Sequence, residues 1–281
     1  MVATPHPLPY WFASGLSFFP GLLLIAAAAC IPLGRLPRRR LAARAATAGA
    51  GAALAILSAA PLPPWACGLG GAVVAAMAVG TDPLGRSHRA AAVALRLAAV
   101  GACLMALAVE LPCHRFPALP LGEGETLCVI GDSLASEPGA RTWPALLGAR
   151  HDVDVVDLTA GGATVNDARR QAAALAGRGL IVLVVGAGDR RAGRSAEDFA
   201  ADLDALVATI NARGPCRVIV VELPLSRRYG LAQRRAIRAL PNRALLPRRV
   251  LAGLLAADGA GLSPDGHGKM AEAIWRAIEP R

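Results

Sequence analysis

Aromatic residues, lysine and clustered cysteines are all scarce in this sequence of 281 residues. Only 4% of the residues are aromatic, and Lys269 is the one lysine, so arginine carries nearly all of the positive charge. The six cysteines form no Cys-x-x-Cys pair and no zinc-type cluster with histidine, so we predict no metal site and no cofactor. The chain is 54% hydrophobic instead, which is too apolar for an ordinary soluble protein.

Acidic residues are nearly missing from the first 119 residues, which hold nine arginines against Asp82 and Glu110. The remaining residues hold 21 basic and 18 acidic residues and are close to balance. The net charge of +10 therefore belongs to the apolar first part, and no nucleic-acid partner is expected. The first ten residues contain neither lysine nor arginine, so they lack the basic start of a cleaved signal peptide.

The first part of the chain has the composition of a membrane domain. Its four apolar stretches are residues 11–34, 43–60, 65–80 and 90–111. The first and last are long enough to cross a bilayer, which takes about 20 residues. The two middle stretches are shorter and rich in Ala and Gly, which permit close helix packing in lipid. We predict a helical membrane domain of about four spans over residues 1–115, with two spans plus a re-entrant hairpin as the alternative.

The basic loops predict the orientation of this domain. Five arginines lie between residues 35 and 44, after the first stretch, and Arg86 and Arg89 follow the third. Such loops stay in the cytoplasm, so the termini and everything after about residue 112 are expected outside a bacterial-type cell membrane. Membrane lipid is then a neighbour of the protein. Arg96 lies within the fourth stretch, where we expect its side chain to snorkel to the membrane surface.

After a Pro- and Gly-containing linker at residues 116–125, apolar runs of strand length alternate with helical stretches. Strands that are apolar on both faces form parallel sheets covered by helices on both sides. We therefore predict a flavodoxin-like, three-layer α/β/α domain over residues 126–281, with "RALLPRRVL" as a fifth strand at the edge of the sheet. Sites in such domains lie at the carboxyl ends of the strands. Three predicted strands end there in small polar turns, at Gly131-Asp132-Ser133, Gly161-Gly162 and Gly186-Ala187-Gly188-Asp189.

These turns carry a specific resemblance. "VIGDSLAS", "DLTAGGAT", "LVVGAGD" and "DGAGLSPDGHGKMAEAI" resemble, in order, the first, second, third and fifth sequence blocks of the SGNH/GDSL hydrolases. That family contains serine esterases, lipases, thioesterases and carbohydrate acetylesterases. The resemblance covers about residues 126–278, leaves out the membrane part, and implies the family's α/β fold.

The resemblance also implies roles for individual residues. Ser133 takes the position of the nucleophile, for which an ordinary helix N-cap is the alternative. Asp258 takes the position of the acid that orients the catalytic histidine. The oxyanion positions fall on Ser133, Gly162 and Gly188, and the accompanying acidic positions fall on Asp132 and Asp189.

Two positions depart from the family pattern. Gly188 stands where the family has an asparagine that donates to the oxyanion, and loss of one such donor costs roughly a hundredfold to a thousandfold in rate. When "MAEAI" is aligned with the family's closing helix, Gly261 falls on the catalytic histidine, and His267 falls at the start of the helix. Two alternatives keep His267 as the base: an Asp265–His267 dyad, or a His267 that turns toward Ser133 from its own register.

These departures leave two functions open. One is a membrane-anchored, outward-facing hydrolase-like protein, ancestrally a serine esterase for acyl or acetyl esters of lipids or envelope glycans, with weakened activity. The other is a catalytically inactive relative that binds an envelope ligand or a partner protein. The stretch 226–249 holds eight arginines and no acid, which indicates either a solvated helix and loop or a site for an anionic ligand. The arginines of that candidate site are Arg227, Arg228, Arg234, Arg235 and Arg238.

Overall fold

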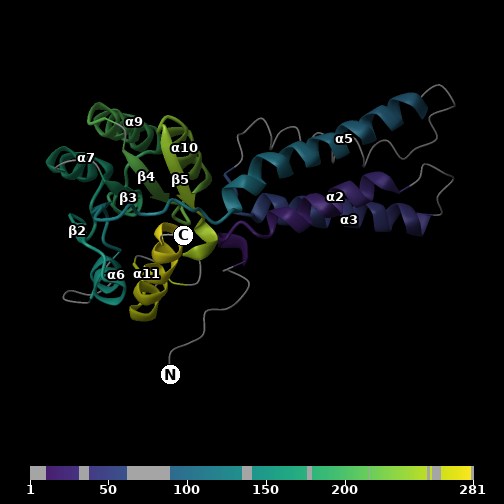
Figure 1. The fold of residues 1–281 in the computed structure, drawn as a ribbon. Helices are drawn as coiled ribbons and strands as arrows, with labels where there is room; N and C mark the ends of the chain where they lie inside the picture. Colours follow the sequence, from purple (N-terminus) through teal and green to yellow (C-terminus); the bar gives the residue numbers. More distant parts are fainter. Residues whose placement is uncertain are drawn as a thin grey trace. The chain divides into compact units, whose positions relative to one another are not determined.

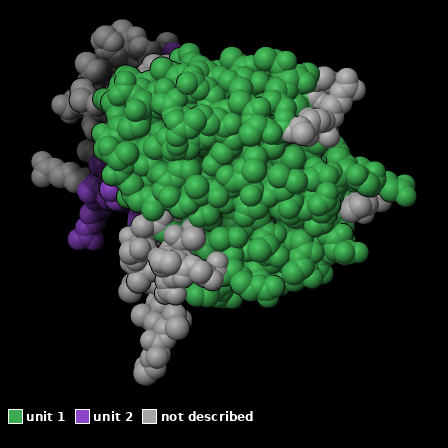
Figure 2. Space-filling view, turned by 90° about the vertical axis from the view of Figure 1, so that its left-hand side faces the viewer, with its two compact units in different colours: residues 1–5, 114–281 green, residues 6–113 purple. Residues whose placement is uncertain are grey.

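The computed structural model describes residues 11–31, 38–61, 89–134, 141–175, 179–214, 216–251, 254 and 261–279. The chain divides into two units (Figures 1 and 2): residues 6–113 form one, and residues 1–5 with 114–281 form the other. Figure 2 shows the larger unit as one closely packed body.

The smaller unit contains three described helices. They are α2 (Phe18–Cys30), α3 (Arg38–Leu57) and α5 (Arg89–Glu110) (Figure 1). Helix α2 packs against both α3 and α5. Helices α2 and α3 approach closely at Gly21 and Gly51, where a Cβ atom on Gly51 would lie 2.6 Å from the carbonyl oxygen of Gly21. Small residues at such crossings are typical of membrane helices.

The structure does not support the four predicted membrane spans. Among the described residues, only Val93–His114 is a helical segment long and apolar enough to cross a membrane. Phe18–Cys30 and Ala42–Leu57 are apolar helices of shorter length. The third predicted span, residues 65–80, lies outside the described residues. Among the described residues, one candidate span by length and composition therefore stands where three of the four were expected.

The larger unit is built on a parallel sheet of five strands, in the order β2-β1-β3-β4-β5. The strands are β1 (Leu127–Gly131), β2 (Val155–Asp157), β3 (Leu180–Val184), β4 (Arg217–Val221) and β5 (Asn242–Leu246). The predicted parallel α/β fold is confirmed, including a fifth strand at an edge, although this strand ends at Leu246 and Arg248–Val250 form a 3₁₀ turn. This strand order is that of flavodoxin-like sheets, in which ligands bind beyond the carboxyl ends of the strands.

Helices cover both faces of this sheet (Figure 1). Helices α6 (Trp143–His151) and α11 (Pro264–Ile278) lie side by side on one face. Helices α7 (Val165–Ala174), α9 (Ala196–Ala212) and α10 (Arg227–Arg238) lie on the other. The turn predicted after β3 instead begins a short helix, α8 (Ala187–Arg191).

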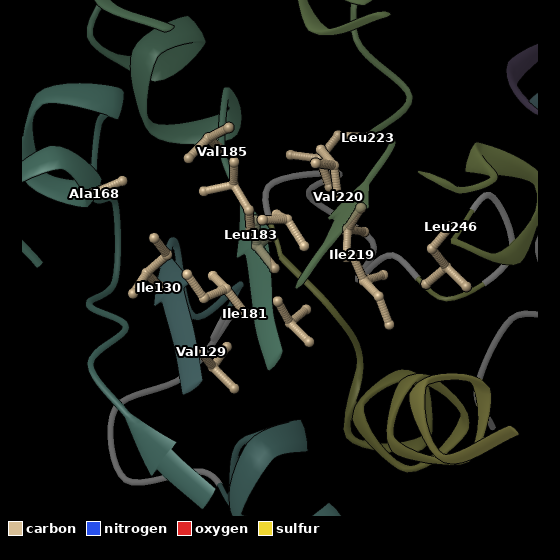
Figure 3. Packing of buried hydrophobic residues seen from close by; sticks show 14 of the residues in the cluster. Val129, Ile130, Ala168, Ile181, Leu183, Val185, Ile219, Val220, Leu223 and Leu246 are labelled. Carbon is tan, nitrogen blue, oxygen red and sulfur yellow. The ribbon is translucent and has the colours of Figure 1, made fainter. Parts of the chain in front are cut away.

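The two central strands β1 and β3 are buried along their whole length, because helices cover both of their faces. Figure 3 shows side chains of β1, β3 and β4 gathered between these layers, among them Ile130, Leu183 and Ile219. The edge strand β2 is partly exposed and only three residues long. The buried core therefore holds the carboxyl ends of β1 and β3 in place, and the candidate site lies beside these ends.

Residues 116–125, the predicted linker, are bonded to the domain. The N–H groups of Leu119 and Leu121 donate to the carbonyl groups of Ala277 and Ile278, at 2.7 Å each. Both leucine side chains pack against the domain core. This segment therefore belongs to the α/β domain.

Candidate functional site

Ser133 follows β1 on a tight turn that Asp132 stabilises. Gly131 has a φ angle of 109°, and a Cβ atom there would lie 1.8 Å from the carbonyl oxygen of Val184. Only glycine fits such a position. On the other side of Ser133, Leu134 has a φ angle of 54°, and its N–H donates to Asp132 Oδ1 at 3.0 Å. The buried Asp132 carboxylate thus holds Leu134 in the left-handed region that a leucine rarely adopts.

Asp132 also joins this turn to two further elements. Its Oδ1 accepts a second hydrogen bond, from the N–H of Gly162, at 3.2 Å. Its Oδ2 forms an ion pair with Arg191 at the end of α8. Arg191 was not among the site residues predicted from the sequence. The available signal was a cation two residues after Asp189, at the edge of the sheet where a site is expected.

Both backbone donors that the resemblance assigns to an oxyanion are bonded within the protein. The N–H of Ser133 donates to the carbonyl of Ala160 at 3.2 Å, and the N–H of Gly162 donates to Asp132. An oxyanion hole requires donors aimed at the oxygen of the substrate. In this arrangement the two donors face acceptors of the protein itself.

Gly188 lies against the loop after β2, which contains Gly162 and Ala163. A Cβ atom at Gly188 would lie 2.2 Å from the carbonyl oxygen of Ala163 and 2.4 Å from that of Gly162. The backbone of the loop therefore fills the space that an asparagine side chain would need. Ser133 borders the loop as well, because its Oγ lies 3.9 Å from the position of a Cβ atom on Gly161. The structure thus brings Ser133, Gly162 and Gly188 together at the carboxyl edge of the sheet.

Asp189 and Asn166 hold the start of α7. Both carboxylate oxygens of the buried Asp189 lie within hydrogen-bond distance of the N–H of Val165, at 3.1 and 3.3 Å. Burial raises the pKa of Asp189 above its ordinary value. Asn166 donates through Nδ2 to Asp202 of α9 at 3.4 Å. This contact gives Asn166 a structural role at the first turn of the helix.

His267 is buried in the first turn of α11, where it caps a neighbouring helix. The N–H of Trp143, at the start of α6, donates to His267 Nδ1 at 3.2 Å, while the N-cap residue Thr142 makes no side-chain cap. Burial lowers the pKa of His267, which favours the neutral imidazole. Because Nδ1 accepts a hydrogen bond, the hydrogen of the neutral ring is on Nε2. A base must face the serine with an unprotonated nitrogen, and the one such nitrogen of this tautomer, Nδ1, already accepts from Trp143.

Three other residues were predicted around the base: Asp258, Gly261 and Asp265. Asp258 lies outside the described residues. Gly261 precedes Leu262, whose N–H donates to the carbonyl of Leu134 at 2.8 Å. Gly261 therefore lies beside the turn of Ser133, where the resemblance expects a histidine. Asp265 pairs with Lys269 on α11 at 2.5 Å. Neither ring nitrogen of His267 bonds to Asp265, because Nδ1 accepts from Trp143 and Nε2 has no partner among the described residues, so the Asp265–His267 dyad is not formed.

Arg234, one of the arginines predicted to bind an anionic ligand, is buried and paired inside the domain. Its Nε lies 2.7 Å from Glu222 Oε1, and Arg248 Nη2 lies 2.6 Å from the same oxygen. Burial raises the pKa of Glu222, but Arg248 and Arg234 outweigh it and hold this pKa below its ordinary value. Arg234 is therefore not available to an external anion.

The exposed arginines of α10 are Arg228, Arg235 and Arg238. Arg228 pairs with Glu197 at 3.6 Å, and Arg235 pairs with Asp204 at 3.0 Å. Binding of an anionic ligand at this face remains a prediction. In the part of the chain that the structure describes, no three His, Cys, Asp or Glu side chains gather in a way that would hold a metal ion.

The comparisons with known proteins concern the larger unit. Similar solved structures include the salicylyl-acyltransferase SsfX3 from a tetracycline biosynthetic pathway (22% identity, TM-score 0.45), the psychrotrophic esterase EstA from Pseudoalteromonas sp. (17%, 0.46) and TesA (26%, 0.44). Each match covers 54% of this chain. The chain spans about half (54%) of the acyltransferase, 96% of EstA and 97% of TesA.

No curated protein matches the chain. Residues 129–260 match the sequence model of the GDSL-like lipase/acylhydrolase family, over slightly less than half of the chain. The matched region includes the turn of Ser133, the loop of Gly162 and the start of α8. Residues 129–260 are therefore a GDSL-like lipase/acylhydrolase domain.

Proposed function

We propose that this protein is a membrane-anchored, outward-facing relative of the serine esterases with weak hydrolytic activity. Its ancestral substrates are acyl or acetyl esters of lipids or envelope glycans. The family match and the position of Ser133 at the carboxyl edge of the sheet support the esterase ancestry. In that chemistry the Ser133 hydroxyl attacks the ester carbonyl, and its proton must pass to a base.

The observation that carries the weak activity is the hydrogen bond from Trp143 to His267 Nδ1. It leaves His267 as a helix cap whose other ring nitrogen carries the hydrogen. Serine is a poor nucleophile at neutral pH without a base, and in subtilisin removal of the histidine lowers kcat by about a millionfold. The occupied N–H groups of Ser133 and Gly162 act in the same direction, because they leave a developing oxyanion without those donors.

The second candidate is a catalytically inactive protein that binds an envelope ligand or a partner protein. It is favoured by Gly188, because the loop backbone packed against it excludes the family's asparagine. A fluorophosphonate probe separates the two candidates, because it labels only a serine that is still activated. Slow labelling at Ser133, absent in Ser133→Ala, supports the weak esterase, and no labelling supports the inactive binder.

The proposed membrane anchor is the helical segment Val93–His114, with the shorter apolar helices beside it. The outward orientation rests on charge. Within the described part of the smaller unit, the arginines lie toward the ends of α3 and α5 that begin at Arg38 and Arg89, while Glu110 ends α5. The arginine-rich end is expected in the cytoplasm, which places the α/β domain on the other side.

Hydrolysis of p-nitrophenyl acetate and butyrate by the full chain in detergent tests the proposed chemistry. The wild type should turn over these esters barely above the background rate. Gly261→His should raise the rate by at least about tenfold, since a positioned base contributes roughly a hundredfold to ten-thousandfold. Gly261→Asn is the matched control, because it adds a side chain of similar size without a base.

Two outcomes would contradict this proposal. Robust wild-type turnover that disappears in His267→Ala would make His267 the base and the protein a working esterase. Robust turnover that survives both His267→Ala and Ser133→Ala would place the reaction outside the predicted site.

A further inference from the structure

We propose that the arginine-rich end of the smaller unit contains a binding site for the phosphate group of an anionic membrane lipid, formed by Arg44 of α3 and Arg96 of α5. The site lies in a different unit from Ser133. It does not depend on whether the α/β domain hydrolyses esters.

Arg96 is held at the carboxyl end of α2. Its Nη1 donates to the carbonyl of Ile31, the C-cap residue of that helix, at 2.8 Å. The free carbonyl groups and the helix dipole favour a cation at this position. The second terminal nitrogen, Nη2, is buried and has no hydrogen-bond partner among the described residues. Arg96 is therefore oriented by one nitrogen and has unused donor capacity on the other.

Arg44 presents a second unused donor. Its side chain belongs to a residue that is only 4% exposed, and its Nε is buried without a hydrogen-bond partner within the described part of the chain. Arg44 and Arg96 lie about one helical turn before Ala48 of α3 and Ala99 of α5, which belong to one buried cluster, so the two arginines lie on neighbouring turns of the packed helices. A buried cation is costly unless it is paired, so the buried Arg44 beside the partly buried Arg96 favours an anion at this place.

The described residues of this unit do not supply that anion. Their one carboxylate is Glu110, at the opposite end of α5 from Arg89. A phosphate group fits the requirement, because its several oxygens accept hydrogen bonds from two guanidinium groups at once.

The position of the pair favours a lipid as the source of the phosphate. Figure 1 shows the carboxyl end of α2 and the amino ends of α3 and α5 at the same end of this unit. In the proposed topology this end lies at the cytoplasmic surface, where anionic lipid headgroups gather and attract basic segments.

Native mass spectrometry of the full chain, delipidated and titrated with phosphatidylglycerol, tests the site. We expect one tightly held lipid on the wild type. Arg44→Gln and Arg96→Gln should each weaken binding roughly tenfold or more, because each removes a charged donor to the phosphate. Arg39→Gln is the matched control, since it removes an exposed arginine from the same helix and should change binding less than about threefold. Arg44→Lys retains the charge but removes Nε, and should also weaken binding if Arg44→Gln does not fold.

Competition experiments identify the source of the phosphate. Inorganic phosphate that binds while phosphatidylglycerol does not would overturn the assignment to a lipid. Equal binding of phosphatidylglycerol by Arg44→Gln and Arg39→Gln would overturn the site itself. Asp82 lies outside the described residues and supplies the internal alternative. Lipid binding by Asp82→Asn but not by the wild type would mean that Arg44 and Arg96 are paired within the chain, which would also overturn the proposal.

Discussion

His267 connects the closing helix of the domain to the start of α6. The imidazole is the acceptor for the N–H of Trp143, because Thr142 does not cap the helix with its own side chain. His267→Ala should lower the free energy of unfolding by about 1–3 kcal/mol, since it leaves a buried donor without a partner. His267→Asn places an oxygen near the position of Nδ1 and should lose less. Thermal unfolding of the full chain in detergent, followed by near-ultraviolet circular dichroism, measures the difference.

The same residue should make stability depend on pH. Burial lowers the pKa of His267 below its ordinary value of 6.5, so the unfolded chain binds a proton more readily than the folded chain. Stability should therefore fall as the pH decreases below about 6.5, and continue to fall until the folded imidazole also titrates. In His267→Asn this component should be missing between pH 7 and 5. An identical pH profile in both proteins would show that His267 is not buried neutral.

At the scale of elements, Gly188 sets the distance between α8 and the loop that contains Gly162. Gly188→Asn should destabilise the domain by about 1–3 kcal/mol, because its Cβ atom meets loop backbone that has no room to move. It should add nothing to the activity of Gly261→His. Gly161→Ala is the matched control, since its Cβ atom would make only an ordinary contact with Ser133. A gain in ester hydrolysis from Gly188→Asn would show that the loop moves away from α8.

The buried ion pairs of Glu222 join β4, α10 and the segment after β5. Glu222→Gln leaves Arg234 and Arg248 buried without their carboxylate and should lower the free energy of unfolding by about 3–5 kcal/mol. Glu197→Gln, which removes an exposed partner of Arg228, should have little effect on the unfolding midpoint. Because its folded pKa is depressed, Glu222 contributes stability above pH 4.5 that is lost as the pH falls through the folded pKa.

The sheet was predictable from local sequence, and the bonding of the site was not. Strands apolar on both faces and small residues at their carboxyl ends placed Asp132 and Ser133 correctly at the end of β1. The partners of the N–H groups of Ser133 and Gly162 depend on how the loop after β2 packs against the turn after β1. No periodicity in the sequence encodes that packing. The ion pair of Asp132 with Arg191 was missed for the same reason, because the helix that positions Arg191 was predicted as a turn.

At the scale of the whole molecule, topology is the decisive test of the proposed membrane anchor. A reporter fused after Arg281 should be active only if it is of the kind that works outside the cytoplasm, because the arginine-rich end of the helical unit is retained in the cytoplasm. Alkaline phosphatase and green fluorescent protein fusions at this position should give opposite signals. A fluorescent fusion with inactive phosphatase would place the α/β domain in the cytoplasm.

The two hydrogen bonds that join Leu119 and Leu121 to Ala277 and Ile278 also impose an order on biosynthesis. The segment of residues 116–125, through which the chain enters the α/β domain, is bonded to residues of α11. The ribosome makes α11 after all five strands. Since domains fold as units, the sheet remains without one of its covering helices until α11 has been translated and, in the proposed topology, exported. A nascent chain interrupted before residue 264 would expose the core face beneath α11. Such a chain is a substrate for the proteases that clear unfinished proteins.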